Sequence, residues 1–335
     1  MKKKNVLLTG ASGTVGYEVL MQLIEKDLYN ITVFDFESKA SRKKLLPFKH
    51  NIEIIFGDIS AAEELNSIKN MDFVIHLAAV IPPVADDFPD LAKSVNLIGT
   101  QNLVNQLEQY SPNAFLMYSS SIAVYGDRIE QPYIKVTDKI RPSDGDFYAK
   151  TKIDAEKDIQ NSALDYTIFR LAAIMGNHKI SKLMFHQPLN TALEIATPRD
   201  TARAFVNGIE KQTELSKRIF NLGGGKLCRI DYEGFLERSF SIFGLGELDF
   251  PKHTFAEKNF HCGYYEDGDD LENIVHFRKD SLEDYFKKEK DKITFGRKFA
   301  TSLFKKPIKW FLLQNSEPFE AFKSQDVDQL KHYFN

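Results

Sequence analysis

The stretch NVLLTGASGTVG, residues 5–16, is a short apolar run followed by a turn rich in glycine. Gly10, Gly13 and Gly16 stand three residues apart, and apolar residues then recur at helical spacing through 15–26. Glycines at such a turn let the backbone approach a pyrophosphate closely, and the helix that follows presents its N–H groups and positive end. The stretch therefore predicts a strand, a tight turn and a helix that bind a dinucleotide. The glycine spacing differs from the commoner G-x-G-x-x-G fingerprint, so a plain strand-to-helix turn is the alternative.

Further short apolar runs follow along the chain, and longer stretches with helical periodicity separate them. Continuous apolar runs of this kind are typical of parallel strands that are covered on both faces. The sequence therefore predicts the α/β class, with a doubly wound parallel sheet. The predicted strands lie at 5–9, 31–35, 52–58, 72–79, 114–120, 165–174 and 218–223, and the predicted helices at 15–26, 91–109, 147–161, 199–211 and 231–244.

The periodicity loosens after Gly176, where we expect a smaller C-terminal lobe that grips a substrate. The predicted division is a dinucleotide-binding core at 1–176, completed by about 199–225, a substrate lobe at 177–198 and 226–294, and a C-terminal amphipathic extension at 295–335.

The segment FGRKFATSLFKKPIKWFLL, residues 295–313, is basic and apolar at near-helical spacing. We expect its helix to break at Pro307. Such a segment can lie on an anionic membrane or meet a partner. The commoner outcome is a helix that docks on its own domain, with Trp310 and Phe311 buried, and this is what we expect.

Composition limits the other function classes. The formal net charge is -3, so no overall field favours nucleic acid or lipid. Two cysteines are too few for a disulfide framework and predict reduced thiols in a cytoplasmic protein. No stretch approaches the 18 or so apolar residues of a membrane-spanning helix. The segment NFHCGYYEDGDD (259–270) has no standard zinc spacing, so we expect a surface loop and no metal.

Several residues at predicted strand ends suit a dinucleotide. Asp35 ends the second strand, where a carboxylate accepts hydrogen bonds from the adenosine ribose. A carboxylate there repels a 2′-phosphate, which favours NAD over NADP, although Arg42, Lys43 and Lys44 lie nearby in sequence and could bind a phosphate. Asp58 and Ile59 are placed to meet the adenine. Leu77, Ala78 and Ala79 follow the fourth strand and leave room for the cofactor, whereas His76 reads as a packed core histidine.

The helix predicted at 147–161 begins with FYAKTK, in which Lys152 follows Tyr148 by four residues. This spacing puts both side chains on one face of the helix. An ammonium beside a phenol stabilises the phenolate, so the pair predicts proton transfer, with Ser121 donating a hydrogen bond to a substrate oxygen. Taken alone, the pair could equally be two ordinary helix residues.

The motifs taken together resemble the extended short-chain dehydrogenase/reductases, in particular the NAD-dependent epimerase/dehydratase group typified by UDP-glucose 4-epimerase. The resemblance rests on TGASGTVG (9–16), Asp58, HLAA (76–79), VNLIGTQNL (95–103), YSSSIAVYG (118–126), Tyr148 with Lys152, and FNLGGG (220–225), all in the family's order. It implies a Rossmann fold, a homodimer and catalytic roles for Ser121, Tyr148 and Lys152. The cofactor-binding residues it implies are Gly10, Ser12, Gly13, Thr14, Val15, Gly16, Asp35, Asp58, Ile59, Leu77, Ala78, Ala79, Asn96, Tyr148 and Lys152.

The resemblance leaves the reaction open. Leu171 replaces the family's proline, and the segment between Gly176 and Pro198 is short for an arginine-bearing insert that binds a diphosphate. A small-molecule substrate is expected, and a sugar nucleotide is one candidate. The alternatives are an epimerase that retains NAD, a carbonyl reductase or dehydrogenase that releases its cofactor each turnover, and a non-catalytic regulator that senses a dinucleotide.

Overall fold

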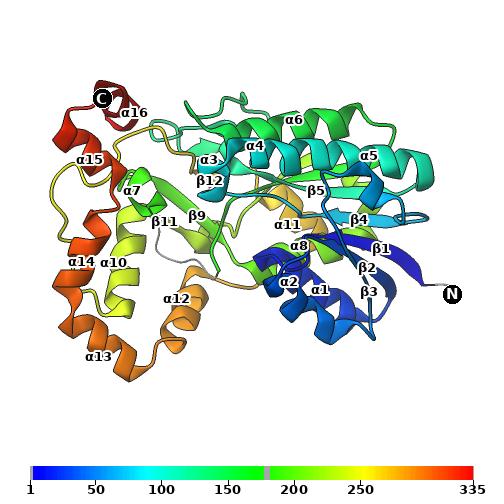
Figure 1. Cartoon of the computed structure of the whole chain (residues 1–335), viewed down its shortest axis with the longest axis horizontal. Helices are drawn as coiled ribbons and strands as arrows, with labels where there is room; N and C mark the ends of the chain where they lie inside the picture. The colour runs from blue at the N-terminus through cyan, green and yellow to red at the C-terminus, as the bar shows by residue number, and fades with distance from the viewer. Residues whose placement is uncertain (1–2, 177–181, 335) are drawn as a thin grey trace.

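The computed structural model describes residues 3–176 and 182–334, and its central element within them is a sheet of seven parallel strands (Figure 1). The strand order is β10-β7-β5-β4-β1-β2-β3, and every neighbouring pair is parallel. The strands are β1 (Lys4–Thr9), β2 (Tyr29–Asp35), β3 (Glu53–Phe56), β4 (Phe73–His76), β5 (Phe115–Ser121), β7 (Asp165–Leu171) and β10 (Arg218–Leu222).

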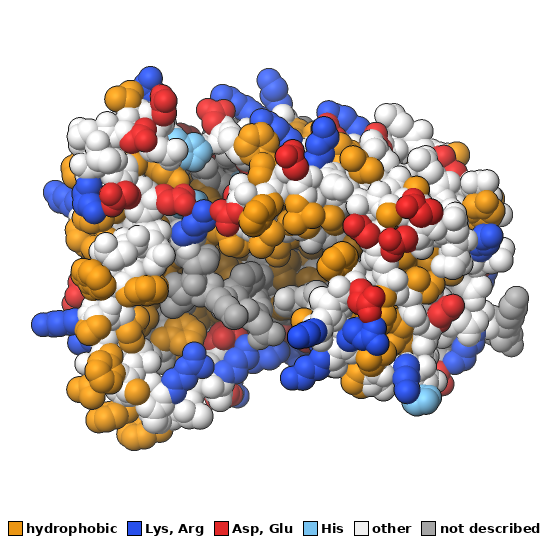
Figure 2. Space-filling view, in the orientation of Figure 1, with side chains coloured by type: hydrophobic (Ala, Val, Ile, Leu, Met, Phe, Trp, Pro, Cys, Tyr) orange, Lys and Arg blue, Asp and Glu red, His pale blue; other side chains and the backbone are white. Residues whose placement is uncertain are grey.

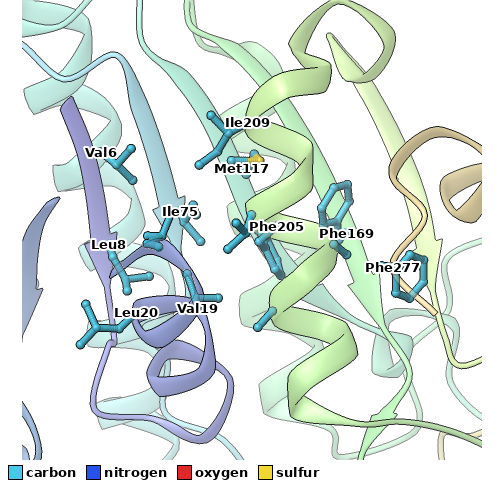
Figure 3. Packing of buried hydrophobic residues seen from close by; sticks show 14 of the residues in the cluster. Val6, Leu8, Val19, Leu20, Ile75, Met117, Phe169, Phe205, Ile209 and Phe277 are labelled. Carbon is cyan, nitrogen blue, oxygen red and sulfur yellow. The ribbon is translucent and has the colours of Figure 1, made fainter. Parts of the chain in front are cut away.

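Helices cover both faces of this sheet, as its buried strands require. One face carries α1 (Thr14–Lys26), α8 (Pro198–Gly208) and α11 (Asp269–Val275), and the other carries α5 (Gly99–Tyr110) and α6 (Phe147–Asn161). Figure 3 shows the first of these interfaces, where α1 and α8 pack their apolar side chains against the strands. The predicted doubly wound parallel sheet is therefore confirmed.

The chain reverses its direction of winding between β1 and β4, which are neighbours in the sheet although they are not consecutive in the sequence. In doubly wound sheets a ligand crevice forms at this point, beyond the carboxyl ends of the strands. The first glycine turn and the HLAA stretch both lie at that edge.

A second lobe lies beside the sheet and has a core of its own, rich in aromatic side chains. It contains a three-stranded sheet of β8 (Ala173–Ile174), β9 (Ala192–Ala196) and β11 (Arg229–Asp231), and the two-stranded pair β6 (Tyr133–Ile134) and β12 (Tyr264–Tyr265) lies next to it. Its helices are α7 (Leu183–His186), α10 (Tyr232–Phe243), α12 (Leu282–Asp291), α13 (Phe295–Leu303), α14 (Lys305–Leu313), α15 (Glu317–Ser324) and α16 (Val327–Tyr333).

Shorter elements complete the connections. They are α2 (Lys39–Leu45), α3 (Val84–Asp87), α4 (Pro89–Ala92) and α9 (Gln212–Leu215), with single turns η1 (Leu46–Phe48), η2 (Ala62–Leu65), η4 (Ile122–Tyr125), η5 (Ile209–Lys211) and η6 (Lys226–Cys228). The helix predicted at 91–109 is present but contains a π-helical stretch, η3 (Lys93–Ile98), between α4 and α5.

Two expectations about the second lobe are wrong. The 259–270 segment is not a surface loop, because Cys262 and Tyr265 are buried and β12 pairs with β6. The C-terminal segment does form helices, but they separate at Phe304 instead of Pro307, and Trp310 and Phe311 are 65% and 64% exposed. Proline is tolerated in the first turn of α14, where it costs no helical hydrogen bond. Across 3–176 and 182–334, no helix combines the length and the apolarity needed to cross a bilayer.

Candidate active site

The glycine turn between β1 and α1 has the backbone geometry that the sequence predicts. Gly10 has a φ of +72°, and a Cβ there would meet the Ala78 nitrogen at 2.7 Å. A Cβ on Gly16 would meet the Gly10 oxygen at 2.1 Å. Both positions therefore require glycine.

The N-terminus of α1 is free to receive an anion. Among the residues that the structure describes, no side chain caps this helix, and its first turn contains no acidic residue. Gly13 and Thr14 are exposed there. Uncapped N–H groups and the positive end of the helix dipole fit a pyrophosphate, so the turn suits a dinucleotide.

Asp35 lies at the end of β2 and is bound to the same turn. Its carboxylate accepts hydrogen bonds from the backbone N–H and the hydroxyl of Ser12, at 2.7 and 2.9 Å. Burial raises the pKa of Asp35, while the two Ser12 bonds and the nearby Lys44 act in the opposite direction. Lys44 donates to the Ser12 carbonyl at 2.7 Å, a contact between residues 32 apart that the sequence could not reveal.

The other predicted cofactor residues line the ends of the adjacent strands. Asp58 is held by Ser60, whose N–H and hydroxyl donate to it at 2.8 and 2.7 Å. Ile59 is buried against Gly99 at the start of α5. The half-buried Leu77, Ala78 and Ala79 follow β4, and Thr9 accepts the backbone N–H groups of the first two. The structure thus brings these residues to one edge of the sheet.

A pocket of about 530 Å³ opens at the glycine turn, between the two lobes. It is bordered by Gly13 and Thr14 on one side and by Lys287 and Lys288 of α12 on the other. Figure 2 shows the molecule hollowed between the two lobes. The entrance to the glycine turn is therefore open.

Ser121 and Tyr148 meet at the carboxyl end of β5. The Ser121 hydroxyl lies beside the Tyr148 phenol, where it acts against the effect of burial on the phenol pKa. Tyr148 stands in the first turn of α6, which begins where the Asp146 carboxylate accepts the Ala149 N–H at 2.7 Å. A carboxylate cap of this kind fixes the start of a helix, and here it fixes the position of the phenol. Tyr148 and Ser121 are 8% and 9% exposed.

Asp146 also connects α6 to the second lobe. His261 Nδ1 lies 3.0 Å from an Asp146 carboxylate oxygen. Burial raises the pKa of Asp146, but His261 and the Ala149 N–H outweigh it, so that the pKa lies below its ordinary value. The His261 side chain thus contacts the cap two residues ahead of Tyr148, a relationship that the sequence gave no signal for.

Lys152 is fully enclosed beneath this pair. Its ammonium donates to the Ser119 carbonyl at 2.8 Å and lies 5.9 Å from the centre of the Tyr148 ring. Burial lowers the pKa of Lys152 to about 7, although Glu156 opposes this shift. Burial also raises the pKa of Tyr148, against the effect of the Ser121 hydroxyl. Burial thus outweighs the neighbouring groups, and the pKa of the phenol lies above its ordinary value.

Contacts behind the site join the glycine turn to Lys152. Thr9 Oγ1 lies 2.7 Å from His76 Nδ1, the His76 ring lies 5.4 Å from the Tyr118 ring, and the Lys152 ammonium lies 4.7 Å from that ring. Burial, followed by the charge of Lys152, lowers the pKa of His76 to about 3. His76 is therefore neutral and buried, which confirms it as a core histidine.

Asn96 lies in the π-helical stretch η3 and is buried. Its side-chain amide exchanges two hydrogen bonds with the backbone of Val80, at 2.7 and 2.9 Å, and donates to Thr151 at 3.1 Å. It therefore ties the loop after β4 to α6. A direct contact of Asn96 with a cofactor stays a prediction.

A buried ion pair fixes α6 on the sheet. Arg170 of β7 donates to both carboxylate oxygens of Glu156 at 3.0 and 2.7 Å, and to the Tyr125 hydroxyl at 2.8 Å. Glu156 follows Lys152 by four residues, so the spacing puts Tyr148, Lys152 and Glu156 on one face of α6. The sequence indicated this face but not its partner.

Three arginines between or within the lobes are bound to carboxylates. Arg199 pairs with Asp280, and Arg229 donates to the buried Glu194 at 2.8 Å. Arg203 pairs with Asp200. Of the three pairs, Arg199–Asp280 joins α8 to the segment before α12, whereas Arg203–Asp200 lies within α8 and Arg229–Glu194 joins β11 to β9.

Comparisons with known proteins place the chain in a family. The model of the NAD dependent epimerase/dehydratase family matches residues 6–194. A 3 beta-hydroxysteroid dehydrogenase/Delta 5-->4-isomerase of Mycobacterium tuberculosis is 26% identical over 213 residues, which are 59% of this chain and 55% of the relative. Probable UDP-arabinose 4-epimerase 3 of Arabidopsis thaliana is 29% identical over 194 residues, which are 53% and 46% of the two chains. The chain thus spans about half the length of these curated relatives.

A solved structure confirms the fold. UDP-glucuronic acid 4-epimerase from Bacillus cereus, in complex with UDP-glucuronic acid and NAD, superposes with a TM-score of 0.70 at 18% identity. The match covers 86% of this chain and 98% of that one.

The family match confirms the resemblance that the motifs predicted, and with it NAD as the cofactor. The roles of Ser121, Tyr148 and Lys152 stay predictions, as do those of the individual cofactor residues. On the match across 6–194, the chain belongs to the NAD dependent epimerase/dehydratase family.

Proposed function

We propose that the chain is an NAD-dependent oxidoreductase that transfers a hydride at a carbinol or carbonyl carbon of a small molecule. The observation that carries the proposal is that the Ser121 hydroxyl lies beside the Tyr148 phenol, with the Lys152 ammonium enclosed one helical turn behind the phenol. A hydroxyl and a phenol that meet beside a dinucleotide crevice are suited to bind one substrate oxygen and to move its proton.

Each of the three residues then has a distinct role. Bound NAD supplies the hydride acceptor and a positively charged ring. Tyr148 takes the proton from the substrate hydroxyl, or returns it, and Ser121 donates a hydrogen bond to the same oxygen. Since burial raises the pKa of the phenol, proton transfer needs positive charge close to Tyr148. Lys152 contributes to this charge from the fixed position that its bond to Ser119 gives it.

The residues that line the crevice at the glycine turn and the neighbouring strand ends would bind NAD. The uncapped start of α1, Gly13 to Gly16, would hold the pyrophosphate, and Asp35 would accept the ribose hydroxyls in place of its Ser12 bonds. Asp58 and Ile59 would meet the adenine. The negative charge of Asp35 supports NAD over NADP.

The second lobe, 177–198 with 226–294, is the proposed substrate lobe, and two substrate classes are candidates. The relatives named for UDP-arabinose and UDP-glucuronic acid support a sugar nucleotide, with epimerisation on retained NAD. The hydroxysteroid dehydrogenase relative supports the second candidate, a dehydrogenase that releases its cofactor. The pairing of Arg199 with Asp280 favours this second candidate, because that arginine is engaged and a diphosphate would have to displace the carboxylate.

The test combines purification with turnover. Mass spectrometry of the purified protein would identify NAD and any second ligand that remains after gel filtration. The protein would then be incubated with NAD and panels of sugar nucleotides, hydroxysteroids and other secondary alcohols, while NADH is followed by its near-ultraviolet absorbance. Stoichiometric NADH supports a dehydrogenase. Conversion of a sugar nucleotide without net NADH supports an epimerase, and a Tyr148→Phe variant with unchanged function would instead identify a non-catalytic sensor.

A further inference from the structure

Helices α13 and α14 carry an apolar surface that faces solvent, which we call the α13–α14 surface (Figure 2). Along α13, Phe295, Phe299 and Leu303 recur every four residues and form one stripe. The apolar members of the surface are 56% to 87% exposed, and they are Phe295, Phe299, Leu303, Phe304, Trp310 and Phe311.

The surface is not needed for packing within the chain. The side of α14 that faces the lobe is supplied by Ile308 and Leu312, which pack against the aromatic core. Trp310 and Phe311, by contrast, are 65% and 64% exposed. Within the described parts of the chain, α13 contains no buried residue at all. A helix pair that is apolar on its outer side as well as its inner side is typical of an interaction surface.

The charged side chains of these two helices are all positive. Residues 295–313 contain five basic side chains and no acidic one, in a chain whose formal net charge is -3. Lys309 is held by Asp249 and by the Glu247 carbonyl. The other four basic side chains make no ion pair within 4.0 Å with any described residue. They are those of Arg297, Lys298, Lys305 and Lys306.

We propose that the α13–α14 surface docks on an anionic lipid membrane. Aromatic and leucine side chains beside unpaired lysines and arginines match the two parts of such a membrane, its acyl boundary and its negative headgroups. Trp310 suits the headgroup level of a membrane, because the indole ring is apolar and its N–H is polar. The docking is peripheral, since it uses the outer side of two short helices.

A second copy of the chain fits the α13–α14 surface less well than an anionic membrane does. A two-fold dimer through this surface would bring the same patch against itself. The four unpaired cations of one copy would then face those of the other, and like charges brought together in a desolvated contact oppose association. The positive charge therefore favours a negatively charged partner, and the apolar stripe favours one with a hydrocarbon layer.

The chain contains a built-in reporter for this proposal. Trp310 is its only tryptophan and lies within the surface. The full-length protein would be mixed with vesicles of phosphatidylcholine alone or with added phosphatidylglycerol. With the anionic vesicles we expect Trp310 emission to shift to shorter wavelength, acrylamide quenching to fall and the protein to sediment with the vesicles. Added salt should reverse all three effects, because it screens the headgroups.

Two variants separate the charge from the apolar contact. Lys305→Gln with Lys306→Gln removes two exposed cations, and each lysine near an anionic surface is worth about a five-fold change in binding, so a loss of about 25-fold is expected. Phe299→Ala with Leu303→Ala should weaken binding without changing its salt dependence. A matched control is Leu28→Ala with Lys49→Gln, which removes one exposed apolar side chain and one exposed lysine from the sheet-bearing lobe and should bind like the wild type.

Three results would overturn the proposal. An unchanged Trp310 emission with every vesicle would show that the surface does not meet lipid. Equal binding to neutral vesicles would remove the charge complementarity on which the proposal rests. An emission shift that needs no lipid and grows with protein concentration would assign the surface to a second copy of the chain.

Discussion

Lys152 donates to the main-chain carbonyl of Ser119 at 2.8 Å, so the lysine of α6 is bound to the strand that ends at Ser121. This bond joins the two elements that carry the proposed catalytic groups. Since the acceptor is a carbonyl and not a carboxylate, the ammonium is hydrogen-bonded but its charge is not neutralised there. Burial lowers the pKa of Lys152, and the charge of Glu156 opposes this shift only in part.

The burial of Lys152 predicts how the free energy of unfolding changes with pH. Its pKa is about 7 in the folded protein and has an ordinary value of 10.5. Between these values the unfolded chain binds more protons, so the cost of burying the ammonium is full below pH 7 and fades as the pH rises toward 10.5. The free energy of unfolding of the wild type, relative to Lys152→Met, should rise by up to about 1.4 kcal/mol per pH unit in this window. Urea unfolding of both proteins at several pH values measures it, and a constant difference would contradict it.

The Tyr148→Phe variant should lose turnover by a factor of about 10²–10⁴, the range typical of a lost general acid or base. The substitution removes only a hydroxyl from a buried ring, so the melting temperature should stay close to that of the wild type. Turnover would be measured with any alcohol that the wild type oxidises. Tyr110→Phe, at the exposed end of α5, is the matched control and should keep full activity. Equal activity of the two variants would remove Tyr148 from the mechanism.

The strands of the sheet could be predicted from sequence because burial on both faces leaves continuous apolar runs, such as 31–35 and 114–120. The site residues at strand ends followed from the same pattern. Their partners did not, because Asn96 and Thr151 are 55 residues apart and the acceptor for Lys152 is a backbone carbonyl, which has no side-chain signature. An amphipathic pattern also cannot tell whether its apolar face has a partner, and the expected burial of Trp310 was wrong for this reason.

We expect Asp35 to set the preference of the protein for NAD over NADP. Asp35→Ser removes the charge that repels a 2′-phosphate and leaves the cation of Lys44, which donates to the Ser12 carbonyl, beside the turn. We expect NAD affinity to fall about ten-fold or more, since a hydrogen bond to a charged group is worth roughly 1.5–3 kcal/mol, and NADP affinity to rise. Calorimetric titration with both cofactors measures the ratio. Asp27→Asn, at the other end of α1, is the control, and an unchanged ratio in Asp35→Ser would contradict the assignment.

The ion pair between Glu156 and Arg170 should hold α6 in register with the sheet. Both side chains are almost fully buried, at 1% and 3% exposure, so Glu156→Ala would leave an uncompensated guanidinium inside the protein. Loss of one partner from a buried pair costs about 3–5 kcal/mol. Replacing both partners with apolar residues, Glu156→Leu with Arg170→Met, should recover part of that cost because the guanidinium is removed together with its partner. Chemical denaturation of the three proteins tests this order, and a double variant less stable than Glu156→Ala would show that the pair contributes net stability. Tyr148 and Lys152 stand on the same face of α6 as Glu156. We therefore also expect Glu156→Ala to lower turnover more than the double variant does, because a displaced α6 also displaces the Tyr148 phenol.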